Sequence, residues 1–362
     1  MASTKKQTRD SGTAGAIAHA ATELPLVTLD SYNLELRAGE GFLGDRANKA
    51  AFWTILNDWR ERLREADEDP IADLPKKKVS KKTLETLLVE GAGEQAGLVM
   101  GAIEDFAREL AGVIKRFLRH DDWRGTERIV VGGGMRGGRL GEMMIGRTGV
   151  LLKGEGVPVD LVPISHDPDE AGLIGASQLM PSWMFKGHDA LLAVDIGGTN
   201  IRTGVVELKF DRSGRLKDAR VRDCQVWKHA EEAPSRKAAV TRIIEMLESA
   251  VRDSHERRLR LAPLIGVGCP GVIRADGSIE RGGQNLPRGN WESERFNLPR
   301  LIREAVPTIA GEETHVVMHN DAVVQGLSEA PNMTDAQRWG VLTIGTGLGN
   351  ARFSNRPPVA RE

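Results

Sequence analysis

The sequence predicts an α/β protein in which short buried strands alternate with amphipathic helices. Three apolar stretches run directly into glycine turns: "RIVVGGG" (128–134), "LLAVDIGGTN" (191–200) and "WGVLTIGTGLG" (339–349). Elsewhere, above all over 94–118, apolar residues recur at three- and four-residue intervals, the period of a helix with one buried face. Strands and helices that alternate in this way are typical of sheets covered by helices.

The first part of the chain predicts a strand, two long helices and a charged segment. Residues 1–20 carry no regular pattern, so we expect a disordered tail, and "LPLVTLDSYNLEL" (24–36) is strand-like. The apolar spacing predicts a helix over 46–66 and a second over 94–118. Between them, 65–82 contains "EADEDP" and "PKKKVSKK". This segment is either a solvated loop, which we favour, or a polyanion site.

Composition limits the functional classes. The 362 residues are 40% hydrophobic with a net charge of −1. They can bury one large core or two domains of about 150 to 200 residues, and nothing global indicates a nucleic acid or a membrane as partner. Cys224 and Cys269 are too few for a disulfide scaffold, and no signal peptide or 18-residue apolar run is visible. We therefore expect a soluble cytoplasmic protein.

The glycine triplet after the first of these strands has two interpretations. Gly132, Gly133 and Gly134 remove every Cβ where the backbone turns, so that a flat ligand or another backbone can approach closely. The alternative is a tight turn without a ligand. A strand, "VDLVPI", and a helix containing "AGLIGA" (171–176) follow, and 181–190 is expected to be a linker.

The second glycine turn carries a carboxylate. Asp195 ends an apolar strand, and Gly197, Gly198 and Thr199 follow, a turn whose amides can bind phosphate oxygens. A carboxylate there would repel phosphates directly, so its useful role is to hold hydrated Mg²⁺. The alternative is an ordinary hairpin turn, which Asp and Gly favour. Arg202 is either a phosphate contact or a surface residue.

A strand-end aspartate lies between the second and third glycine turns. "THVVMHNDAVVQGL" predicts a strand running into a helix, with Asp321 at the junction. Such an Asp could accept a proton from an alcohol, or it could cap the helix. His319 at the same strand end is expected to be packed rather than catalytic. The turn at 345–349 then repeats the glycine pattern.

These motifs together resemble the ROK family of sugar kinases and repressors, within the superfamily of actin, hexokinase and Hsp70. "DIGGTNIR" resembles its first phosphate motif, "GCPG" and "QNLP" its sugar-side loops, "HNDA" its catalytic motif and "GTGLG" its second phosphate motif. In that family the adenosine-side "GGG" and the "AGLIGA" helix come last, whereas here they come first. The resemblance implies a two-lobed, ribonuclease H-like sugar kinase fold that is circularly permuted.

The resemblance also implies a domain division. It places a larger lobe at 21–180, equivalent to the family's usual C-terminal part, and a smaller lobe at 191–335, equivalent to its N-terminal part. Strands over 336–356 would return to the larger lobe, with a tail at 357–362.

The site implied by the resemblance binds ATP and Mg²⁺. Asp321 would be the general base and Asp195 would hold Mg²⁺ through water. Phosphate contacts would come from Gly197, Gly198, Thr199, Asn200, Arg202, Gly345, Thr346, Gly347 and Gly349. The adenosine side would be Gly132, Gly133 and Gly134, and substrate contacts Asn285, Asn320, Gly271, Glu23 and Asp45.

The sequence departs from the family pattern near its substrate loops. "ELPL" lies where the family has Glu-x-Gly-His, so Glu23 matches the Glu while Leu26 replaces the His, and Gly44 or Asp45 stands in place of a sugar-binding Glu. The cysteine-rich zinc motif has no counterpart, so we expect no zinc, since such sites need about four N or S ligands.

We therefore expect ATP-dependent phosphorylation of a sugar hydroxyl, with a hexose such as glucose as substrate. The alternative is a sugar or nucleotide binding protein without turnover. The resemblance also implies a homodimer, whereas DNA binding is not expected because no helix-turn-helix domain precedes the motifs.

Overall fold

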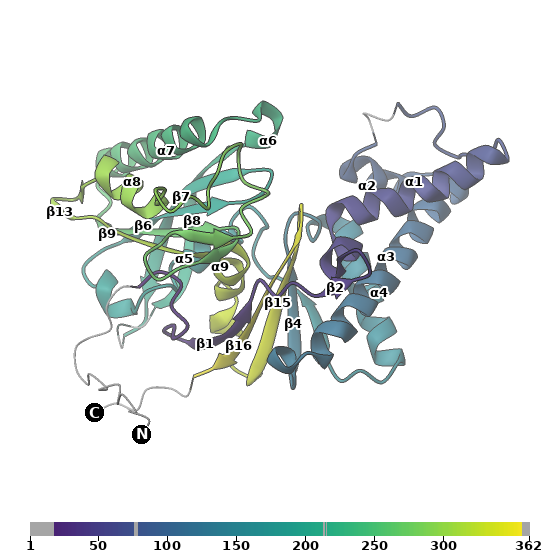
Figure 1. Cartoon of the computed structure of the whole chain (residues 1–362), viewed down its shortest axis with the longest axis horizontal. Coiled ribbons are helices and arrows are strands. Elements are labelled where there is room, and N and C mark those ends of the chain that lie inside the picture. The colour runs from purple at the N-terminus through teal and green to yellow at the C-terminus, as the bar shows by residue number, and fades with distance from the viewer. Residues whose placement is uncertain (1–17, 76–78, 213, 215, 357–362) are drawn as a thin grey trace, which may run out of the picture.

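The computed structural model describes residues 18–75, 79–212, 214 and 216–356, and it contains two five-stranded mixed sheets (Figure 1). The first sheet has the strand order β8 (Leu216–Trp227), β7 (Ile201–Phe210), β6 (Ala190–Ile196), β9 (Leu261–Cys269), β14 (His315–Asn320). The second has the order β1 (Val27–Tyr32), β16 (Leu348–Asn355), β15 (Arg338–Ile344), β4 (Arg128–Gly132), β5 (Asp160–Pro163). The expected mixed α/β class is confirmed.

The two sheets share one arrangement of strands. In the first, β6, β7 and β8 form an antiparallel meander, and β9 and β14 extend it in parallel from β6. In the second, β15, β16 and β1 form the meander, and β4 and β5 extend it in parallel from β15. The third strand of that meander therefore comes from the beginning of the chain, although its first two strands come from the end.

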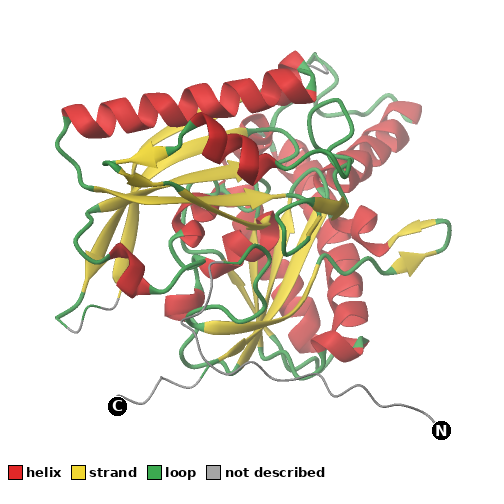
Figure 2. Ribbon diagram, turned by 60° about the vertical axis from the view of Figure 1, so that its left-hand side comes forward, coloured by secondary structure: helices red, strands yellow, loops and turns green. Residues whose placement is uncertain are grey.

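Helices surround both sheets and also pass between them (Figures 1 and 2). The second sheet carries α1 (Lys49–Glu65), α2 (Lys81–Glu90), α3 (Gly93–Arg119) and α4 (Gly138–Gly154). The first carries α6 (His229–Glu232), α7 (Arg236–Glu256) and α8 (Leu298–Ala305). Two short helices, α5 (Ala171–Ala176) and α9 (Asp321–Leu327), pack on each other and carry the chain from one sheet to the other. The small strands are β2 (Arg37–Ala38), β3 (Gly41–Phe42), β10 (Val272–Ile273), β11 (Ile279–Arg281), β12 (Thr308–Ile309) and β13 (Glu312–Glu313).

Apolar side chains form three clusters that follow this architecture. One lies between the two sheets and includes α5 and α9, with Trp339 stacked on Phe353 at 4.4 Å between ring centroids. The second contains residues of α1, α2, α3 and α4 together with β4 and β15. The third contains residues of α7 and α8 together with β6 and β9. No helix in the described part of the chain is long and apolar enough to cross a membrane.

The glycines of α5 explain how the middle layer packs so closely. A Cβ built on Gly175 would lie 1.7 Å from the backbone oxygen of Val324 in α9. A Cβ built on Gly172, one turn earlier on the same helix, would lie 2.5 Å from the carboxyl carbon of Asp195 in β6. Two glycines three residues apart share a helix face, so "AGLIGA" lets α5 touch both a helix and a strand end.

Both long helices expected in the first part of the chain are present. The helix expected over 46–66 is α1, and the one expected over 94–118 is α3. The preferred interpretation of 65–82 as a solvated loop is wrong at Asp69, whose side chain is 1% exposed and lies 3.0 Å from both Arg60 Nη2 and Arg64 Nε. Residues 1–17 of the expected N-terminal tail lie outside the described residues. The expected C-terminal tail, 357–362, also lies outside them. Within the range expected to be disordered, Ala20 N donates to Met318 O (3.0 Å), because this segment lies along β14.

Candidate active site

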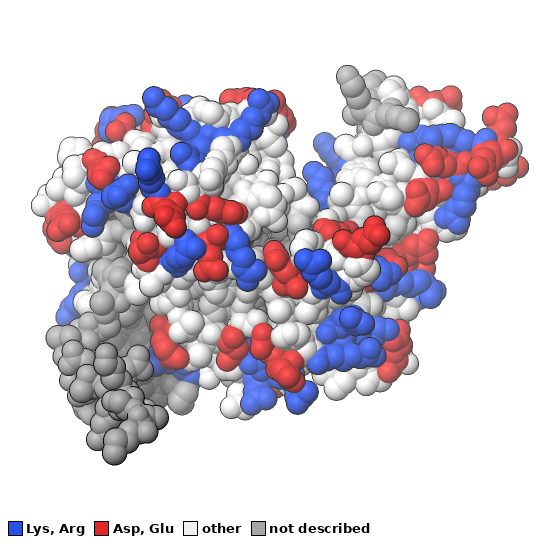
Figure 3. Space-filling view, in the orientation of Figure 1, with Lys and Arg blue, Asp and Glu red and all other residues white. Residues whose placement is uncertain are grey.

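A pocket of about 780 Å³ lies between the two sheets with their helices, and Figure 3 shows the surface hollowed there. It lies at the carboxyl ends of parallel strands: Gly271 closely follows β9, Asp321 follows β14 and Gly133 follows β4. Ligand sites of open α/β sheets commonly lie at this edge. The sequence motifs therefore converge on one cavity although they are spread over most of the chain.

The two glycine turns lie against each other on the pocket wall. Gly197 N donates to Asn200 O (2.9 Å) in one turn, and Gly345 N donates to Gly347 O (3.0 Å) in the other. The hydroxyls of Thr199 and Thr346 are 3.1 Å apart. Both turns present backbone amides and a hydroxyl to the same space, which is the chemistry that binds phosphate oxygens.

Side-chain size limits how closely the turns approach. A Cβ on Gly198 would lie 2.9 Å from Thr346 Oγ1 and 3.3 Å from Asn285 Cβ. Asn285 is therefore placed beside both turns. Glycine at 198 is required by this approach rather than by a left-handed backbone.

Asp195 is buried beneath the first turn, with 1% of the residue exposed. Arg202 Nη1 donates to its Oδ2 (3.1 Å), and the same guanidinium donates to Asp169 Oδ1 from Nη2 (2.6 Å). Burial raises the pKa of Asp195, while the charge of Arg202 opposes that shift. Arg202 is thus not a surface residue: its side chain is 12% exposed, lines the pocket and bridges two carboxylates.

The second oxygen of Asp195 fits a hydrated cation. Oδ1 is buried and has no hydrogen-bond partner among the described residues. A Cβ built on Gly268 would lie 3.5 Å from this oxygen and 3.6 Å from Asp321 Cα, so glycine leaves space between the two aspartates. The described residues contain no group of three His, Cys, Asp or Glu side chains suited to direct metal binding. Oδ1 is thus an unpaired acceptor to which a water of a hydrated cation could donate, but Asp195 does not itself line the pocket.

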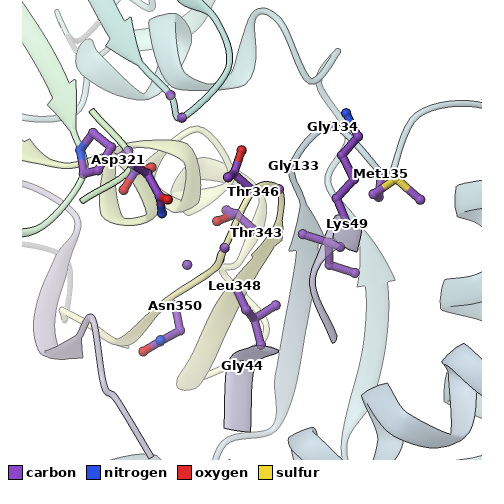
Figure 4. A pocket seen from close by; sticks show the side chains of 18 of the residues that line it. Gly44, Lys49, Gly133, Gly134, Met135, Asp321, Thr343, Thr346, Leu348 and Asn350 are labelled. Carbon is purple, nitrogen blue, oxygen red and sulfur yellow. The ribbon is translucent and has the colours of Figure 1, made fainter. Parts of the chain in front are cut away.

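Asp321 begins α9 and lines the pocket. Burial, and then the negative charge of Asp195, raise the pKa of its carboxyl to about 7. The helix cap is supplied by Asn320, whose Oδ1 accepts from Ala322 N (3.0 Å) and Val323 N (3.2 Å). Of the two roles expected for Asp321, the side-chain cap therefore belongs to its neighbour, and the carboxyl of Asp321 faces the cavity (Figure 4).

Two neighbouring side chains serve the fold. Asn320 Nδ2 donates to Gly271 O (3.0 Å), so the amide expected to contact substrate holds two loops together outside the pocket lining. His319 Nδ1 accepts from Asn320 N (2.7 Å), and burial lowers the pKa of His319 to about 4. His319 is packed, as its position at the strand end predicted.

The glycine triplet lets another backbone segment approach closely. This is part of the first interpretation given above, in which a flat ligand or another backbone comes near the turn. Gly133 has φ +84°, and a Cβ there would lie 2.6 Å from the backbone nitrogen and oxygen of Ile344. Gly133 and Gly134 line the pocket, whereas Gly132 lies beneath it beside Gln325 and Ile164.

Most of the site residues expected from the sequence line this one cavity. They are Gly133, Gly134, Gly197, Gly198, Thr199, Asn200, Arg202, Gly271, Asn285, Asp321, Gly345, Thr346, Gly347, Gly349 and Asp45. Glu23 does not: its carboxylate pairs with Arg356 Nη1 (3.3 Å), and its side chain is 61% exposed. The reason is that the start of β1 pairs with the end of β16, which holds Glu23 at a sheet edge away from the cavity.

A short loop that follows β1 also lines the pocket, and no sequence motif marks it. Asn350 holds this loop by accepting from Leu34 N (2.9 Å) and donating to Leu34 O (3.1 Å). The side-chain amide nitrogen of Asn33 is buried there and has no partner in the described part of the chain, and Glu35 also lines the pocket. The sequence predicts a strand-like stretch through residue 36. In the structure β1 ends at Tyr32, because the next residue, Asn33, has a left-handed backbone (φ +49°).

No known protein family matches the sequence, and no curated protein matches it. Among solved structures, a "putative sugar kinase" from Cytophaga hutchinsonii is 18% identical with a TM-score of 0.32, over 46% of this chain and 48% of that one. A "putative N-acetylmannosamine kinase" from Listeria monocytogenes is 23% identical with a TM-score of 0.31, over 46% and 47%. The chain thus aligns with about half the length of each, and neither similarity establishes its family.

Proposed function

We propose that this chain is an ATP-dependent sugar kinase of ROK type, with the two-lobed fold of the actin and hexokinase superfamily. The observation that carries the proposal is the cavity that two glycine turns and Asp321, with its raised pKa, line together, with Asp195 buried beneath the first turn. Perturbed carboxylates in a cleft are typical of functional sites.

The repeated strand arrangement supports the fold and its circular permutation. Two sheets with the same order, joined by α5 and α9, are what two ribonuclease H-like lobes require. The second meander is complete only when β1 follows β16, and the two strands pair from Val27 with Asn355 to Tyr32 with Ala351. Moving the chain ends to this point changes chain order and leaves spatial neighbours unchanged.

In the proposed reaction the site residues position the reacting groups and neutralise the charge on the phosphates. These two effects supply most of the acceleration in phosphoryl transfer. The turn amides and threonine hydroxyls bind the phosphates of ATP. Asp195 would hold Mg²⁺ through water, and that ion supplies neutralisation of phosphate charge. Asp321 accepts the proton of a sugar hydroxyl as its oxygen bonds to the γ-phosphorus, while the bond from that phosphorus to the ADP oxygen breaks.

A binding protein without turnover is the second candidate. The observation that favours it is the pairing of Arg202 with Asp195, because an arginine already neutralises the carboxylate on which the magnesium site depends. A sensor could bind sugar or nucleotide in this arrangement without transferring a phosphoryl group.

The deciding experiment measures ADP release from Mg·ATP with a panel of hexoses, amino sugars and polyols. The kinase proposal expects release that depends on one class of compound, with glucose the first to test. Binding of ATP with no release for any compound would reject the kinase in favour of the binding protein.

The raised pKa of Asp321 predicts a pH dependence. The base must be ionised, so kcat/KM for the sugar should fall roughly tenfold per pH unit below about pH 7 and level off above it. Steady-state rates across about pH 5 to pH 9 check this. A profile that stays flat through pH 7 would contradict the assignment of Asp321 as the group that titrates.

Asn33→Ala should weaken the sugar and spare the nucleotide. Asn33 lines the pocket and its side-chain amide nitrogen has no partner among the described residues, so its loss should raise the sugar KM about tenfold with kcat and the ATP KM unchanged. Asn57→Ala, on the exposed face of α1, is the matched control. A sugar KM within about twofold of the original protein would show that Asn33 does not contact the substrate.

A further inference from the structure

Two lysines line the pocket at the end away from the proposed base. Lys49 is the first residue of α1, and its backbone nitrogen donates to Gly345 O (2.9 Å), directly beside the second glycine turn. Lys81 is the first residue of α2, and its Nζ donates to Gly134 O (3.1 Å). Figure 4 shows Lys49 on the same side of the pocket as Gly133 and Gly134, with the turn at Thr346 between this side and Asp321.

The charges of these lysines are only partly balanced by the surrounding protein. Neither side chain makes an ion pair with any carboxylate of the described residues. Burial lowers the pKa of Lys81; Glu85 opposes this shift, while the positive charges of Arg136 and Lys49 add to it. Glu85 itself accepts from Leu140 N (3.3 Å). Like charges held near each other beside an open cavity indicate a ligand of opposite charge.

Charged side chains of both signs line the cavity. They include the carboxylates of Glu35, Asp45 and Asp321 and the cations Arg202, Lys49 and Lys81. Figure 4 shows Asp321 and Lys49 on opposite sides of the turn at Thr346. A ligand that places a hydroxyl near Asp321 and an anionic group near Lys49 would match both sides of this turn.

We infer that Lys49 and Lys81 form a subsite for the phosphate chain of the donor, continuing from the glycine turn at Gly345 toward Gly134. This inference rests on the proposed function and adds to it a pair of residues that select a phosphate chain over an uncharged nucleoside. It assigns to Lys81 the polyanion role that the lysine-rich segment allowed. Lys76, Lys77 and Lys78 of that segment lie outside the described residues.

Binding measured without sugar tests the inference separately from turnover. Dissociation constants of Mg·ATP, inorganic tripolyphosphate and adenosine are determined by calorimetry for the original chain, Lys49→Gln, Lys81→Gln and the double variant. Each single variant should weaken Mg·ATP and tripolyphosphate about tenfold and leave adenosine unchanged. Lys153→Gln, an exposed lysine of α4 whose side chain is 68% exposed, is the matched control.

The possible outcomes distinguish failure of the lysine subsite from failure of the proposed kinase activity. Unchanged affinity for Mg·ATP and tripolyphosphate in both single variants, or failure of both compounds to bind the original chain, overturns the inference. An equal loss for adenosine also overturns it, because the lysines would then act through packing. Tripolyphosphate binding comparable to Mg·ATP supports a site for the phosphate chain alone, and tighter Mg·ATP binding supports a nucleotide donor. Lysine-dependent binding without ADP release rejects the kinase and keeps the subsite.

Discussion

Asp321→Asn is expected to reduce turnover by about 10² to 10⁴-fold while Mg·ATP binds with nearly unchanged affinity. The substitution keeps the size of the side chain and removes only its ability to accept a proton, and a positioned base contributes about that factor. Since the proposed phosphate contacts are the two glycine turns and the two lysines, and do not include Asp321, nucleotide affinity should not follow turnover. ADP release at saturating substrate and calorimetric ATP binding measure the two quantities.

The control for this variant is Asp58→Asn, which makes the same change on the exposed surface of α1. It should turn over at the rate of the original chain. Asp321→Asn should also be at least as stable to urea as the original chain, because partial burial and the negative charge of Asp195 both disfavour the ionised carboxyl of Asp321. Turnover of Asp321→Asn within about threefold of the original would remove Asp321 from the role of base.

The parts of the site predictable from sequence are those whose chemistry is local. An apolar strand followed by glycine marks β4, β6 and β15 in the sequence itself, because the strand needs apolar residues and the turn needs missing side chains. Asp195 could be selected because it ends such a strand, and Asp321 because it directly follows the apolar strand β14. The "AGLIGA" helix is implied by the family resemblance, and it matches α5 in the structure.

The remaining site residues depend on contacts between distant parts of the chain. Lys49 and Lys81 begin two different helices, and only the packing of α1 and α2 on α3 brings both to the pocket. A lysine within a charged run carries no local sign of this. Asn320 and Asp321 are adjacent, and the exact turn from β14 into α9 decides which one caps the helix. Glu23 illustrates the opposite error, because a motif match placed it at the substrate while strand pairing holds it at a sheet edge.

Gly175→Ala is expected to destabilise the fold by about 3 kcal/mol, the upper end of the usual cost of overpacking a core. The added Cβ would lie 1.7 Å from Val324 O and 2.8 Å from Val324 C. Both are backbone atoms of α9, so no side-chain rotation relieves the overlap and the two helices must separate. Urea unfolding followed by circular dichroism measures the change.

Gly146→Ala provides a control in which the same substitution has the opposite sign. Gly146 lies inside α4, is exposed and has no atom within 4 Å of a built Cβ, so alanine should stabilise that helix by about 0.5 to 1 kcal/mol. Separation of α5 from α9 would also displace Asp321, the first residue of α9, so Gly175→Ala should lower turnover at temperatures where it remains folded. If Gly175→Ala were as stable as Gly146→Ala, close contact between α5 and α9 would not be what holds the two aspartates in one site.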